Sequence, residues 1–194
     1  EKRSQVVGGN YHIVFCLDRS GSMGVGQTPN TRWDHLKRSF SSFLNTVDTP
    51  GSSHFVSIIV FDNEAKVQKT LISVAEAKRH NLGNLGGATN FAPPLINALN
   101  VIISGRQRNP SLQPLVVFMS DGDNHDRGAP TDTALNNLKA ELNDSHFIFF
   151  GTDTGKDYLQ DMSQKIGGNF HATVDGIALE QTFTSIAQGI SQNC

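Results

Sequence analysis

The sequence YHIVFCLDRSGSMG, at residues 11–24, decides how the rest of the chain is interpreted. It contains a continuous apolar run, residues 13–17, that is too short to span a membrane and does not alternate with polar residues. Such a run is typical of a strand buried on both faces, as in a parallel sheet covered by helices. Asp18, Ser20 and Ser22 end the run, and open α/β sheets bind their ligands beyond the carboxyl ends of the strands. The stretch therefore predicts a central strand with a polar loop at its carboxyl end.

The rest of the chain alternates between strand patterns and helix patterns. Strands are expected at residues 11–18, 54–61, 65–71, 115–119, 147–150 and 170–174. The 65–71 segment alternates polar and apolar residues after a turn, which is typical of an antiparallel edge strand. The helix before residue 115 is expected to bury Phe91, Leu95, Leu99, Ile102 and Ile103. The pattern predicts an α/β fold, with a doubly wound, mostly parallel sheet, one antiparallel edge strand and helices on both faces.

Composition narrows the class of protein. The 194 residues show no linker and no change of composition, so we expect a single domain over 1–194, with the polar residues 1–9 as an N-terminal tail. A formal charge of −2 gives no reason to expect nucleic acid or an anionic membrane as a partner. No apolar run approaches the ~18 residues of a membrane-spanning helix.

The two cysteines say little about the compartment. Cys16 lies in the first strand and is expected to be a buried free thiol, whereas Cys194 is either free or paired outside this chain. The chain has no CxxC pair and so no zinc framework. The lack of an obvious disulfide pair leans the interpretation slightly towards an intracellular protein, with an extracellular or secreted one left open.

Small oxygen-bearing residues recur at three places in this predicted fold. Asp18, Ser20 and Ser22 follow the first strand, Thr89 follows Gly86-Gly87, and Asp121 follows the strand at 115–119. If the strands that end at Asp18 and Asp121 are neighbours, both carboxylates flank one crevice. Hydroxyls and carboxylates, without a thiolate or an imidazole, suit Mg²⁺ or Mn²⁺ rather than zinc. These five residues are the candidate metal ligands, and we expect them on the rim of the domain rather than in its core.

These segments resemble a von Willebrand factor A domain with its metal-ion-dependent adhesion site (MIDAS). Asp18, Ser20 and Ser22 match the D-x-S-x-S motif, Thr89 the threonine of the second loop, and Asp121 the aspartate of the third. The resemblance implies a Rossmann-like fold and direct ligation of Mg²⁺, with Mn²⁺ or Ca²⁺ as alternatives, by the serines and often the threonine. It implies aspartates that act directly or through water, and a final helix that shifts when the metal shell changes.

The resemblance also implies a function. Domains of this kind receive an Asp or Glu carboxylate of a protein partner on the metal, so the expected function is metal-dependent protein binding and not catalysis. Two versions stay open, an extracellular cell-adhesion module and an intracellular assembly module. In either version we expect the domain to belong to a larger multidomain protein.

Other interpretations of these residues compete with the metal site. Ser22, Asp121 and His171 come in the chain order of an α/β-hydrolase triad, but the first glycine of the G-x-S-x-G elbow is replaced by Ser20 and no helix follows at once. Asp/Ser/Gly clusters such as Asp18-x-Ser20 also form simple turns, and we expect Asp62 to be a turn residue. The segment 123–127 is expected to be a solvated loop. The seven histidines show no HxxxH spacing and are expected to be scattered, and Trp33 is expected in the core.

Overall fold

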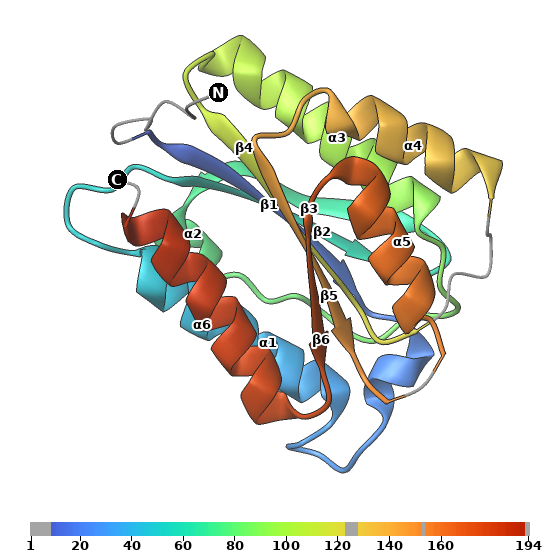
Figure 1. The fold of residues 1–194 in the computed structure, drawn as a ribbon. Coiled ribbons are helices and arrows are strands. Elements are labelled where there is room, and N and C mark those ends of the chain that lie inside the picture. The colour runs from blue at the N-terminus through green and yellow to red at the C-terminus, as the bar shows by residue number, and fades with distance from the viewer. Residues whose placement is uncertain (1–8, 123–127, 153, 193–194) are drawn as a thin grey trace.

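Figure 1 shows the computed structural model, in which residues 9–122, 128–152 and 154–192 are described. The strands are β1 (Tyr11–Asp18), β2 (Phe55–Phe61), β3 (Ala65–Ser73), β4 (Gln113–Ser120), β5 (Asp144–Phe150) and β6 (Asn169–Thr173). The helices are the 3₁₀ turn η1 (Gly21–Gly24) and α1 (Arg32–Val47), α2 (Val74–Ala77), α3 (Ala92–Arg108), α4 (Ala129–Lys139), α5 (Lys156–Ile166) and α6 (Gly176–Gln192). No described helix is long and apolar enough to cross a membrane.

The six strands form one sheet in the order β3-β2-β1-β4-β5-β6. All neighbouring pairs are parallel except β2 with β3, which is the predicted antiparallel hairpin at one edge. The order reverses between β1 and β4, because β2 and β3 lie on one side of β1 while β4, β5 and β6 lie on the other. The carboxyl ends of β1 and β4 therefore meet at the point where such sheets bind ligands.

Two helical layers cover the sheet, with α1, α2 and α6 on one face and α3, α4 and α5 on the other (Figure 1). The pleat of β1 divides its side chains between the two cores: Ile13, Phe15 and Leu17 pack towards α1 and α6, and Val14 and Cys16 towards the opposite face. Every apolar residue of the run is fully buried. The doubly wound fold expected from the sequence is thus confirmed.

The structure corrects details of the predicted elements. In α3 the buried stripe includes Val101, whereas Ile103 is 41% exposed and does not belong to it. The wrong assignment arose because the residues around 101–103 are all apolar, and only the packing of the helix decides which of them faces the sheet. Val174 lies beyond the end of β6 and is 66% exposed. Trp33 is in the core as expected, and Cys16 is a buried free thiol.

Candidate metal centre

Four of the five predicted ligands are joined by hydrogen bonds at the carboxyl ends of β1 and β4. Asp18 Oδ1 accepts the backbone N–H of Ser20 at 2.7 Å, and the Ser20 and Ser22 hydroxyl oxygens lie 3.1 Å apart. Ser22 Oγ donates to Asp121 Oδ1 at 2.8 Å across 99 residues of sequence. Two loops far apart in the chain thus share one polar cluster.

The loop that carries Thr89 is bound to the first loop through its backbone. Gly86 N–H donates to the Arg19 carbonyl at 2.7 Å, and Gly21 N–H donates to the Gly87 carbonyl at 2.8 Å. A Cβ on Gly86 would lie 1.8 Å from Asp62 Oδ2, so only glycine permits this close approach. Thr89 is 4% exposed in this loop. The fold therefore holds the second predicted loop against the first.

Asp18 is not on an exposed rim, which corrects the expectation from the sequence. Its side chain is fully buried, because β1 is a central strand and both neighbouring strands extend alongside its end. Ser120 Oγ donates to Asp18 Oδ2 at 2.6 Å, so both oxygens of the carboxylate have partners. Burial raises the pKa of Asp18 to about 6, with the nearby Asp121 acting in the same direction and the Ser120 and Ser20 hydrogen bonds opposing it. Ser22 is the exposed member of the cluster.

Two arginines near the cluster were not predicted as part of it. Arg32 Nη1 lies 2.7 Å from Asp121 Oδ2, and the Asp121 side chain is fully buried in this ion pair. Arg19 Nη2 lies 3.0 Å from Asp62 Oδ2, while Asp62 Oδ1 accepts the Glu64 N–H in the expected turn. Arg32 follows Thr31, whose side chain caps α1 in a capping box with Asp34. No local pattern relates Arg32 to Asp121, so the sequence carries no signal for this contact.

The donor chemistry fits a hard divalent cation. Within the described part of the chain, no cluster of three or more His, Cys, Asp or Glu side chains is placed to hold a metal. The candidate set instead combines two carboxylates with three hydroxyls, which are ligands preferred by Mg²⁺, Mn²⁺ and Ca²⁺. The raised pKa of Asp18 means that burial opposes its charge, and a dication beside it would offset that cost. Residues 123–127, expected as a solvated loop, lie outside the described residues.

The hydrolase triad is not formed. Ser22 donates directly to Asp121, whereas a Ser-His-Asp relay places the histidine between them. His171 lies in β6, where its Nε2 is 3.0 Å from His146 Nδ1. The three residues therefore follow hydrolase order in sequence without hydrolase geometry.

The fold and site together define an α/β domain whose polar cluster lies at the switch point of a doubly wound sheet. The chain belongs to the von Willebrand factor type A domain family, whose model matches residues 13–124. Domains of this family commonly mediate protein interactions and adhesion. No curated protein sequence matches the chain.

Solved structures share the fold at low sequence identity. A von Willebrand factor type A protein from Catenulispora acidiphila is 18% identical with a TM-score of 0.80, over 94% of this chain and 43% of the other. The conserved hypothetical protein BatB from Bacteroides thetaiotaomicron is 15% identical with a TM-score of 0.77, over 94% and 100%. Proximal thread matrix protein 1 from the mussel byssus, solved with a zinc-occupied MIDAS motif, is 18% identical with a TM-score of 0.75, over 95% and 48%. The chain thus spans about half the length of the first and last of these.

Proposed function

We propose that this domain binds a divalent cation through Asp18, Ser20, Ser22, Thr89 and Asp121 and uses it to bind a protein partner through an Asp or Glu carboxylate. The observation that carries the proposal is the hydrogen-bonded cluster that joins Asp18, Ser20, Ser22 and Asp121 at the switch point of the sheet. Mg²⁺ is the first candidate, with Mn²⁺ and Ca²⁺ as alternatives, because every donor is oxygen. The bound ion would supply a positive charge with a coordination position for a carboxylate oxygen.

The buried and exposed residues of the cluster have different proposed roles. Asp18 is fully buried and holds the Ser20 N–H and the Ser120 hydroxyl, so it fixes the loop and contributes negative charge. Ser22 is exposed and lies between Ser20 and Asp121, on the side open to a partner. Arg32 pairs with Asp121 Oδ2, while Asp121 Oδ1 faces Ser22. Proximal thread matrix protein 1, which shares the fold and was solved with a zinc-occupied MIDAS motif, supports the binding of a dication at such a site.

Calorimetric titration of Mg²⁺ into the chelator-stripped protein tests the metal. We expect saturable binding in the wild type and its loss in Ser22→Ala, because the exposed hydroxyl links the two loops. The matched control is Ser111→Ala, whose hydroxyl bonds only locally to Asn109 at 2.7 Å and which should bind Mg²⁺ as the wild type does. Equal binding by Ser22→Ala and the wild type would contradict the assignment.

Acetate is a simple probe of the carboxylate step. With the protein labelled by ¹⁵N, acetate should shift the amide signals of Gly21 and Gly122 in Mg²⁺ and leave them unchanged in chelator. These amides belong to the two loops that would hold the ion, and Gly122 N–H also donates to Ser120 Oγ at 3.2 Å. Shifts of the same size with and without Mg²⁺ would show that the carboxylate does not bind through the metal.

A further inference from the structure

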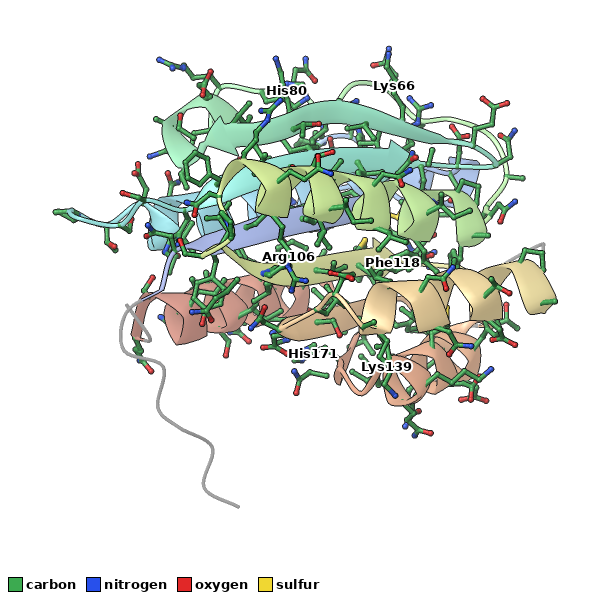
Figure 2. The ribbon with its side chains drawn as sticks, turned by 90° about the horizontal axis from the view of Figure 1, so that it is seen from above. Lys66, His80, Arg106, Phe118, Lys139 and His171 are labelled. Atoms are coloured by element: carbon green, nitrogen blue, oxygen red, sulfur yellow. The ribbon has the colours of Figure 1, made fainter. Side chains whose placement is uncertain are left out.

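A second polar cluster lies far from the loop of Asp18, on the β6 side of the sheet. His146 in β5 and His171 in β6 stack with ring centroids 5.3 Å apart and an interplanar angle of 24°. His146 Nδ1 and His171 Nε2 are 3.0 Å apart. Figure 2 shows the labelled His171 on the opposite side of the molecule from His80 and from Lys66, which is a residue of β3. The expectation of scattered histidines therefore misses one close pair.

The strand register explains how the two rings meet. β5 and β6 are parallel, with His146 opposite Asn169 and His171 opposite Ile148. The two histidines are diagonal neighbours, and diagonal neighbours on one face of a sheet are within reach when the side chains are long. Nothing in their spacing of 25 residues predicts this, because it depends on the pairing of two strands joined by α5.

Asp144 fixes the orientation of the first ring. Its Oδ2 lies 3.3 Å from His146 Nε2, and its Oδ1 accepts the Ser145 N–H at 2.8 Å and the Asn169 side-chain amide at 3.0 Å. A carboxylate on Nε2 keeps the proton there and leaves a lone pair on Nδ1, which points at His171. This carboxylate–imidazole arrangement is the one that commonly supports histidine ligands of metals.

A hollow beside the pair leaves space for further ligands. A cavity of about 190 Å³ lies between the sheet and α6, and its lining includes both histidines, Asp144, Tyr11 and Ser185. The volume exceeds that of several water molecules at ~30 Å³ each. Burial and the neighbouring His146 lower the pKa of His171.

We propose that His146 Nδ1 and His171 Nε2 bind a transition-metal dication of the zinc, nickel or copper class, with Asp144 as the positioning residue. Imidazole nitrogen suits these ions, whereas the all-oxygen cluster at Asp18 suits hard cations best, so the two sites differ in their donor chemistry. Two nitrogens at ~2.0–2.1 Å from a tetrahedral zinc ion lie roughly 3.4 Å apart, so the pair opens by only a few tenths of an ångström. His171 then carries its proton on Nδ1.

The coordination sphere is completed from outside the pair. No third His, Cys, Asp or Glu joins these nitrogens in the ranges that the structure describes, so water or a side chain of another molecule takes the remaining positions. The cavity provides the room for them. The site is independent of the proposed function, since it shares no residue with the Mg²⁺ cluster.

Zinc and copper are the probes that test this site. All variants carry Ser22→Ala and Cys194→Ser, so that neither the first site nor the terminal thiol contributes. We expect Zn²⁺ to bind by calorimetry and to raise the melting temperature of this background, and we expect His146→Asn and His171→Asn each to abolish both effects. The matched control is His80→Asn, since His80 pairs with Gln68 at 2.8 Å on the far edge and should leave Zn²⁺ binding unchanged.

Two further measurements distinguish metal binding by the histidines from a purely structural role of the pair. Asp144→Asn should weaken the binding of Zn²⁺ by about tenfold without abolishing it. A loss of this size is usual when a residue that hydrogen-bonds to a metal-ligating histidine is replaced. Cu²⁺ electron paramagnetic resonance should show coupling to two imidazole nitrogens in the background, and this two-nitrogen signal should be absent in His171→Asn. Zinc binding that survives both histidine substitutions, or a background that binds no Zn²⁺ while folded, would overturn the proposal and leave a hydrogen-bonded histidine pair only.

Discussion

His12 should make the stability of this domain depend on pH. The side chain is 1% exposed in β1, its Nε2 lies 2.8 Å from Ser57 Oγ, and that same oxygen accepts the Leu71 N–H at 3.0 Å. α3 closes the other side of the ring, since a Cβ on Gly105 would lie 2.7 Å from His12 Nδ1. This burial lowers the pKa of His12 from 6.5 to about 4. The folded protein therefore holds the ring neutral where the unfolded chain protonates it.

The direction and the size of this pH dependence follow from the difference in proton binding between the folded and unfolded states. Below the unfolded pKa the unfolded chain binds more protons than the folded one, so the free energy of unfolding falls as the pH falls from 6.5 towards about 4. Between pH 7 and pH 5 the loss from His12 alone is about 2 kcal/mol, and it approaches about 3 kcal/mol at lower pH. Such a loss is a large part of the ~5–15 kcal/mol that stabilises a typical domain.

Urea unfolding at a series of pH values measures this loss. His12→Gln removes the titration and keeps a polar group for Ser57, so its stability should fall by about 2 kcal/mol less than that of the wild type over the same range. The comparison uses the change in unfolding free energy with pH in each protein. Any pH-independent loss of stability caused by the substitution therefore cancels. His80→Gln is the control, because His80 pairs with Gln68 outside the core and should reduce the loss far less. An unchanged loss in His12→Gln would show that His12 is not the group whose titration destabilises the domain.

Two other substitutions test the loops around the candidate metal centre. Arg32→Gln leaves the buried Asp121 carboxylate without its ion pair, so the protein in chelator should lose about 3 kcal/mol in urea unfolding. The same change removes a positive charge, so calorimetry should show Mg²⁺ binding roughly tenfold more tightly, and weaker binding would contradict the charge argument. Gly86→Ala forces a Cβ against Asp62 and should cost about 1–3 kcal/mol. The control is Gly189→Ala in α6, where nothing lies within 4 Å of the added Cβ. It should instead stabilise the protein by about 0.5–1 kcal/mol. Equal changes in stability for the two glycine variants would contradict a clash between the Cβ added at Gly86 and Asp62.

Local patterns predicted most of this fold because each depends on neighbours in the chain. The apolar run of β1 identifies a doubly buried strand, and the spacing of Trp33, Leu36 and Phe40 identifies the buried face of α1. The assignment failed at Ile103, where consecutive apolar residues leave the facing side to tertiary packing. Periodicity identifies an element more reliably than it identifies the side chain that faces the core.

For the candidate site, too, the sequence predicts the local features and misses those that depend on tertiary packing. Asp18, Ser20 and Ser22 form a local motif, and the switch-point rule brings Asp121 beside them once β1 and β4 are neighbours. The burial of Asp18 and its bond to Ser120 were not predicted, because they depend on how far the neighbouring strands extend. Ion pairs and histidine pairs that join distant strands and helices carry no sequence signature at all. Only the assembled sheet reveals them.

The most direct test of the central claim is the anomalous scattering of Mn²⁺ in crystals grown with that ion. We expect one strong peak within ligand distance of the Ser20, Ser22 and Thr89 hydroxyl oxygens, beside Asp18 and Asp121. In crystals of Ser22→Ala the peak should disappear or weaken greatly. A well-ordered set of these five side chains without a peak, or a peak at other residues, would contradict the claim that they form the metal centre.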